Sequence, residues 1–173
     1  MKTFTPTVSH LRMLASIRAQ MWMIRRDFVS EFALSALEVA DRSAERKDDS
    51  WMDDYYEMRK AAFMDSNRVA HIQIVGALMH KAPAIYEKIG IVTRYETIIA
   101  ESKAMISAGA RGIVYHTSSP GGTVTGCIEA AQFVQGITIP TMAYCKGLAC
   151  SAAYKVIAGT DGISASPSAE VGN

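Results

Sequence analysis

Apolar residues in the first forty positions recur at the spacing of a helix. Such residues, three or four positions apart, line one face of a helix and predict helix over residues 9–40, with Asp27 able to cap a second one. The stripe consists of Leu11, Leu14, Ile17, Met21, Phe28, Phe32 and Leu37. Residues 41–60, "DRSAERKDDSWMDDYYEMRK", carry closely mixed charges, which is typical of a solvated helix or a connector. We therefore expect a helical N-terminal segment with a charged connector over residues 1–66.

The pattern changes over residues 67–173, where strand-like and helix-like stretches alternate. The runs "RVAHIQIVGAL", "ARGIVYHTSSPGG", "IPTMAYCKG" and "GISASPSAEVG" are rich in β-branched or apolar residues and predict strands, the second of which ends in a Gly-rich turn. Between them, "YETIIAESKAMISA", "VTGCIEAAQFVQGI" and "CSAAYKVIAG" predict helices. Such alternation predicts an α/β fold with a mainly parallel sheet and flanking helices.

Composition narrows the class of protein. The chain has 173 residues, 49% of them hydrophobic and 20% charged, with a formal net charge of +1, which is ordinary for a globular protein with a core. Basic residues alternate with acidic ones, so we expect no nucleic-acid partner, and no apolar run is long enough to span a bilayer. Cys127, Cys145 and Cys150 lack metal-type spacing, so we expect reduced thiols in a cytoplasmic setting and neither metal nor cofactor.

Two predicted strand-to-helix junctions offer candidate chemistry. In parallel sheets these junctions share one edge, where α/β proteins place their sites. The stretch "CKGLACSAAYKV" places Ser151 among small residues where a helix begins, so Ser151 is a candidate nucleophile. The amide of Ala152 and an amide of Gly121 or Gly122 could form an oxyanion hole, because glycine lets a carbonyl reach the backbone. The alternative is a tight packing corner and a simple Gly-Gly turn.

The two junctions together resemble a known family. "GIVYHTSSPGGTVTG" followed by "IPTMAYCKGLACSAAYKVIAGTDGISASPSAEVGN" resembles the signal peptide peptidase A (SppA) family of serine peptidases, over about residues 67–173. That family's pattern is a strand, SPGG, a strand, and an A-x-S-[GA]-[GA]-Y loop, here with Tyr154 three residues after Ser151. The variant "ACSAAY" and the leader "MWMIRRDFVSEF" look most like the bacteriophage branch, whose members are head-maturation (prohead) proteases.

The resemblance implies a ClpP/crotonase-type core, assembly into homo-oligomeric rings, Ser151 as nucleophile, and the Gly122 and Ala152 amides as oxyanion donors. It also implies scaffold or capsid proteins as substrates, cut inside the assembling procapsid in the host cytoplasm. We expect an extended peptide to lie between the two loops and add a strand to an exposed edge. The residues expected to bind it are Ser119, Pro120, Thr123, Lys146, Gly147 and Leu148.

The resemblance also implies a Ser/Lys dyad, in which a desolvated lysine with a lowered pKa is the general base. In single-domain members that lysine follows the serine by about fifty residues, a position beyond Asn173, so we expect the 173-residue chain alone to show little turnover. Lys155, Lys146 and His116 are weaker alternatives: the two lysines are more typical of a surface and the histidine of a packed ring.

Two other functions remain open. One is an inactive scaffolding or ring-assembly module that keeps the oligomer surfaces of such a protease. The other is a crotonase-like acyl-thioester enzyme, which shares the fold and a two-amide oxyanion hole but needs no serine at position 151. The serine-centred loop of small residues argues against this second alternative.

Overall fold

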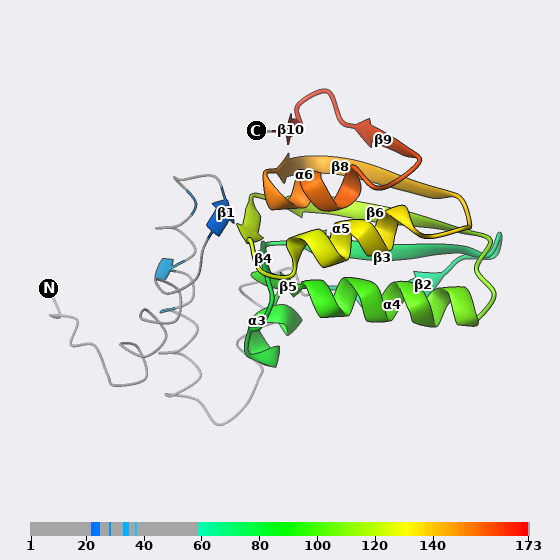
Figure 1. The fold of residues 1–173 in the computed structure, drawn as a ribbon, viewed down its shortest axis with the longest axis horizontal. Helices are drawn as coiled ribbons and strands as arrows, with labels where there is room; N and C mark the ends of the chain where they lie inside the picture. The colour runs from blue at the N-terminus through cyan, green and yellow to red at the C-terminus, as the bar shows by residue number, and fades with distance from the viewer. Residues whose placement is uncertain (1–21, 25–27, 29–32, 35–36, 38–58, 173) are drawn as a thin grey trace, which may run out of the picture.

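A computed structural model describes residues 22–24, 28, 33–34, 37 and 59–172 of the chain. Its centre is a six-stranded sheet in the order β10-β8-β6-β3-β2, with β9 paired to β8 (Figure 1). The strands are β2 (Phe63–Met64), β3 (Val69–Val75), β6 (Gly112–Ser119), β8 (Thr141–Cys150), β9 (Gly162–Ala165) and β10 (Glu170–Gly172). All pairs in this sheet are parallel except β2 with β3.

A second, smaller sheet lies at one end of the first (Figure 1). Its strand order is β1-β7-β4-β5, and β4 pairs in parallel with both β5 and β7. The members are β1 (Trp22–Ile24), β4 (Ala77–Met79), β5 (Val92–Arg94) and β7 (Gly121–Thr123). Since β4 follows β3 and β7 follows β6 almost directly, each of these two short strands continues the path of a strand of the large sheet.

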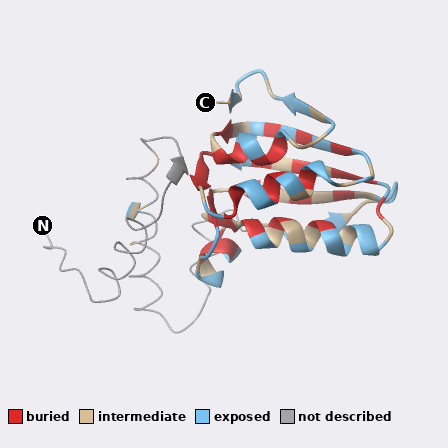
Figure 2. Cartoon of the chain, in the orientation of Figure 1, coloured by how far each residue is buried: buried red, intermediate tan, exposed pale blue. Residues whose placement is uncertain are grey.

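Three helices cover one face of the large sheet: α4 (Tyr95–Ser107), α5 (Cys127–Gln135) and α6 (Ala152–Ile157) (Figure 1). A short helix, α3 (Ala84–Lys88), precedes β5. The helices turn buried residues toward the sheet and exposed ones outward (Figure 2). In β3 the burial alternates residue by residue, because successive side chains of a strand point to opposite faces.

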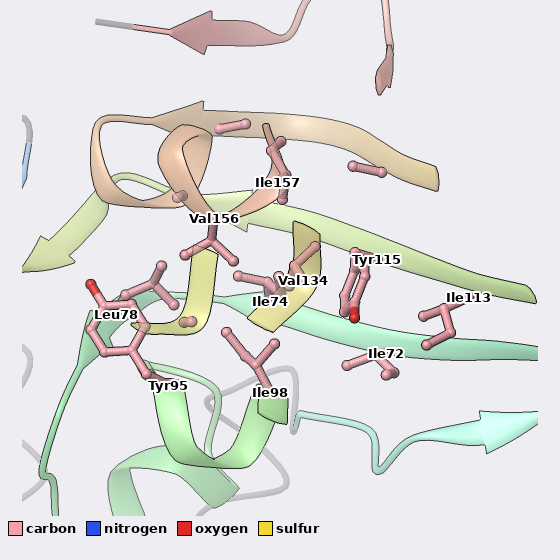
Figure 3. Packing of buried hydrophobic residues seen from close by; sticks show 14 of the residues in the cluster. Ile72, Ile74, Leu78, Tyr95, Ile98, Ile113, Tyr115, Val134, Val156 and Ile157 are labelled. Atoms are coloured by element: carbon pink, nitrogen blue, oxygen red, sulfur yellow. The ribbon is translucent and has the colours of Figure 1, made fainter. Parts of the chain in front are cut away.

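The core fills the space between the helices and the sheet (Figure 3). Its largest fully buried side chains include Tyr95 and Tyr115, together with isoleucines from β3, β6, α4 and α6. The hydroxyl of Tyr115 shares a 2.8 Å hydrogen bond with Ser102 Oγ, and that of Tyr95 donates to the Thr123 carbonyl at 2.6 Å. Both rings can therefore be buried without leaving a polar atom unpaired.

The predicted fold class, α/β with a parallel-sheet core and flanking helices, is confirmed. Two local predictions are wrong. Trp22–Ile24 form strand β1 within the stretch predicted as helix, because pairing with β7 overrides helical periodicity. The Gly-Gly segment after β6 is strand β7 rather than a turn, because it pairs with β4 and β1.

The remainder of the predicted helical leader lies mostly outside the described residues. Its described positions Phe28, Ala33, Leu34 and Leu37 are helical. At the other end of the segment, β2 precedes residue 67 and pairs with β3. The division of the chain after residue 66 stays a prediction.

Candidate active site

The two predicted loops meet because their strands are parallel neighbours. Ser119, the last residue of β6, pairs with Ala149 near the end of β8. Two residues further along each chain path, Gly121 begins β7 and Ser151 leads into α6. Helix α6 also packs against β7. The sheet thus places the Gly-Gly strand and the serine turn side by side at one edge.

Ser151 has an unusual backbone conformation, with φ 53° and ψ −118°. Arg68 is the other non-glycine residue with a positive φ in the described part of the chain. Such conformations cost of order 1–3 kcal/mol for a side chain with a Cβ. The turn is held by two backbone hydrogen bonds: the Ser151 N–H donates to Gly172 O at 3.1 Å, and Lys155 N–H donates to Ser151 O at 2.9 Å. A serine on a sharp, strained strand-to-helix turn presents its hydroxyl for nucleophilic attack.

Small residues surround Ser151 because the turn is tightly packed. Cys150, Ala152 and Ala153 are buried, and Cys127 Sγ lies 3.7 Å from the Ala152 carbonyl oxygen. A larger side chain at these positions would have to displace α5 or the sheet. The Ala152 N–H is the first of α6, so no carbonyl one helical turn earlier receives it. The Ala152 amide therefore suits the predicted oxyanion role.

The two glycines of β7 are demanded by the backbone. Gly121 has a φ of 107°, and a Cβ on Gly122 would overlap the backbone carbonyl of Leu78 in β4. The Gly121 N–H donates to Ser119 Oγ at 3.3 Å, which leaves Gly122 as the better oxyanion candidate of the two. The positive φ thus explains Gly121 and close packing explains Gly122, both without any chemistry, and both glycines bring their backbone to the site.

The other predicted substrate-binding residues fall into two groups. Ser119, Pro120 and Thr123 are buried, and the Thr123 hydroxyl accepts the His80 N–H at 3.2 Å and donates to the Thr125 carbonyl at 3.1 Å. Their side chains are packed within the first loop, and their role in binding a peptide stays a prediction. Leu148 is partly exposed, while Lys146 and Gly147 line a groove of about 500 Å³ that also borders His116 and Tyr144.

His116, one of the alternative bases, is engaged on the sheet face opposite the helices. Its Nε2 lies 2.9 Å from Nδ1 of His71, and the two rings stack at 5.2 Å. His71 Nε2 in turn lies 3.5 Å from Asp65 Oδ2. Burial, and then the neighbouring His71, hold the pKa of His116 below its usual value. This chain of three groups was missed from the sequence, although same-face positions on two paired strands could have revealed it.

The two alternative lysines point to other surroundings. Lys155 is exposed and lines a groove between α5 and α6 with Ile128 and Gln132. Lys146 is exposed, and its carbonyl accepts a 2.7 Å hydrogen bond from Ser166 Oγ. Within residues 59–172, no side-chain hydrogen bond joins the Ser151 hydroxyl to a lysine or a histidine.

The described residues contain no group of three or more His, Cys, Asp or Glu side chains arranged to hold a metal ion. Nor does any helix in the described part of the chain have the length and apolarity needed to cross a membrane. Cys127, Cys145 and Cys150 are buried and form no disulfide within the described residues, and burial raises the pKa of the Cys127 and Cys145 thiols. Their thiols are thereby kept protonated and poorly nucleophilic.

The chain is similar in sequence to a protein of a bacteriophage. The chain is 31% identical over 90 residues to the head-tail preconnector protein GP5 of Enterobacteria phage P21. The match covers 50% of this chain and 18% of the phage protein, so the chain spans less than a fifth of that relative. No protein-family model matches the chain.

Among solved structures, the chain is similar to a mutant of ClpP1 from Listeria monocytogenes, with a TM-score of 0.42 and 15% identity over 54% of this chain and 47% of that one. It is also similar to a mutant of 1510-N, a membrane-bound stomatin-specific protease, with a TM-score of 0.45 and 16% identity. This second match covers 58% of this chain and 44% of the protease chain.

Proposed function

We propose that this chain carries the nucleophile and oxyanion hole of a serine peptidase. The observation that supports it most is the left-handed backbone of Ser151 on the turn between β8 and α6. A strained residue persists only where its surroundings enforce it, and such residues cluster at active sites. The resemblance of both loops to the SppA pattern supports the same assignment.

In the proposed reaction, Ser151 Oγ attacks the carbonyl carbon of a peptide bond and gives its proton to a base. The carbonyl oxygen becomes an oxyanion that accepts hydrogen bonds from the Ala152 and Gly122 amides. The C–N bond then breaks, the amine leaves with the proton, and water hydrolyses the acyl-enzyme. We assign the base to a lysine beyond Asn173, with a pKa lowered by desolvation.

We further propose that the substrate is an extended segment of a scaffold or capsid protein and that the enzyme is a homo-oligomeric ring within a phage procapsid in the host cytoplasm. Likeness to a phage head-tail preconnector protein supports the viral setting. An extended peptide fits because β7 is a short strand beside Ser151 that can pair through its backbone.

Labelling with a fluorophosphonate serine probe tests the nucleophile. We expect slow labelling of the 173-residue chain, accelerated about tenfold by a primary amine such as propylamine at about pH 9, because the amine replaces part of the missing base's contribution. Ser151→Ala should abolish the labelling. Ser118→Ala is the matched control, since Ser118 is an exposed serine on the adjacent strand β6 and should not matter.

Labelling that survives in Ser151→Ala would remove Ser151 as the nucleophile. Absence of labelling in the unmodified chain, with and without amine, would favour the inactive ring-assembly module. If acyl-CoA binds with micromolar affinity while labelling is absent, the crotonase-like alternative is the better description.

A further inference from the structure

Strand β7 lies between β4 and β1, which pair with it in different directions and over different lengths. On one edge it pairs in parallel with β4 at a single position, Leu78 with Gly122. On the other edge it pairs antiparallel with β1 at three successive positions: Trp22 with Thr123, Met23 with Gly122, and Ile24 with Gly121. Segments far apart in the sequence thus lie side by side at this end of the molecule (Figure 1).

The edge of β7 that faces β4 is occupied by that strand. The backbone of Gly122 packs so closely on the Leu78 carbonyl that no Cβ would fit between them. A strand added to β7 therefore has to use the opposite edge. Among the described strands, β1 holds that edge.

Strand β1 pairs with β7 in the way that an extended peptide pairs with the edge of a sheet, through backbone groups. Within the described residues β7 is its only ladder partner, and the contact is a backbone register of three residues. Main-chain hydrogen bonds to an exposed sheet edge are how extended peptides are bound by strand addition. The strand it contacts also packs against α6, which begins directly after Ser151.

We infer that Trp22–Ile24 occupy, in the same chain, the strand position that a peptide substrate takes on β7, an inference that rests on the peptidase function proposed above. β1 then blocks the site until it leaves the edge. Substrate affinity is reduced by the fraction of molecules in which β1 remains paired, since a binding-competent state that is only partly populated weakens apparent binding by that fraction.

Proline variants of β1 test this. In an antiparallel pair, only every second residue of a strand donates its N–H to the neighbouring strand. Proline has no N–H, so a proline at one of the two neighbouring positions 23 and 24 must remove a hydrogen bond from β1 to β7. We therefore compare Met23→Pro and Ile24→Pro with Met23→Val and Ile24→Val, which keep the N–H and favour a strand. Hydrogen exchange at residues 121–123 measures the pairing, and fluorophosphonate labelling of Ser151, with propylamine present, measures access.

We expect one or both proline variants to raise the exchange of amides at 121–123 and the labelling rate of Ser151 about tenfold each, as for a site freed from about nine-tenths occupancy. The valine variants should match the unmodified chain. Because exchange needs no nucleophile, it reports on the pairing even if Ser151 never labels, an outcome that would count against the peptidase function alone.

Three results would overturn the inference. The first is unchanged exchange at residues 121–123 in both proline variants. The second is faster exchange with an unchanged labelling rate, because β1 would then cover β7 without blocking Ser151. The third is protection that disappears on dilution of the unmodified chain, because the strand on β7 would then come from a second copy.

Discussion

At both strand-to-helix junctions the chain needs a residue with a positive φ, but one junction uses a glycine and the other a serine. After β6 the chain turns through Gly121 at a φ of 107°, and after β8 it turns through Ser151 at 53°. Glycine adopts such angles at little cost in free energy, whereas the Cβ of serine makes them unfavourable. The first junction is therefore explained by its backbone alone, and the second is not.

The comparison distinguishes a small residue that packing requires from one that packing does not require. Gly122 is required because a neighbouring carbonyl fills the space of its side chain. Nothing in the packing requires a hydroxyl at position 151, where glycine would relieve the backbone. A side chain kept where the backbone favours its absence is a stronger sign of chemistry than a glycine kept where the backbone demands it.

The largest expected effect breaks the first junction. Gly122→Ala should destabilise the chain by about 3 kcal/mol or prevent folding, because its Cβ would overlap the Leu78 carbonyl, which cannot move away as a flexible side chain would. Chemical denaturation measures the loss. Gly112→Ala is the control, since Gly112 also lies in a strand without a positive φ, and an added Cβ there would come no closer than 3.3 Å to the Pro140 carbonyl oxygen. Equal losses in both variants would show that the close approach of Gly122 to Leu78 is not what makes the substitution costly.

The next effect concerns the support of β7. Tyr95→Phe removes the buried hydroxyl that donates to the Thr123 carbonyl at 2.6 Å and should cost about 1.5 kcal/mol in unfolding free energy. Tyr115→Phe is the matched control, because its buried hydroxyl bonds Ser102 instead. Both should lower stability, but Tyr95→Phe alone should change the labelling of Ser151. Identical labelling rates in the two variants would show that the support of β7 by Tyr95 does not affect the reactivity of Ser151.

A smaller effect compares two replacements of Ser151, the proposed nucleophile. Ser151→Gly should be more stable than Ser151→Ala by about 1 kcal/mol, because glycine removes the Cβ strain at a φ of 53° whereas alanine keeps it. Thermal and denaturant unfolding measure the difference, and neither variant should label. If alanine were the more stable of the two, the turn would not be strained.

The smallest effect tests whether His116 acts as the base for Ser151 at the second junction. Its pKa lies below the usual value when folded, so the unfolded chain binds the proton more readily and stability should fall as the pH drops below about 6.5 toward the folded pKa. His116→Gln should flatten that dependence between about pH 7 and 5. Its labelling at Ser151 should stay unchanged, whereas a labelling rate near background would make His116 the base.

Much of the sheet follows from the sequence. β-Branched runs and helical stripes after residue 66 predicted β3, β6, β8 and helices α4 to α6, because these elements bury one face and repeat accordingly. Elements of two to five residues, such as β2, β5 and α3, carry too few positions for a periodic signal.

The candidate site was predicted only where local pattern and topology agree. Parallel strands necessarily bring Gly121 and Ser151 to one edge, so their proximity could be argued from the sequence. The pairing of Met23 with Gly122 could not, because it joins distant segments through backbone groups that any residue provides. The link between His71 and His116 depends on the strand register, which the sequence alone left open.

The hydrogen bond from the Ser151 amide to the Gly172 carbonyl also sets an order of events. A chain made from its N-terminus can pair β3, β6 and β8 before residues 170–172 exist, and only then can β10 close against the serine turn. The turn at Ser151 therefore gains its contact with β10 after the other three strands are available to pair.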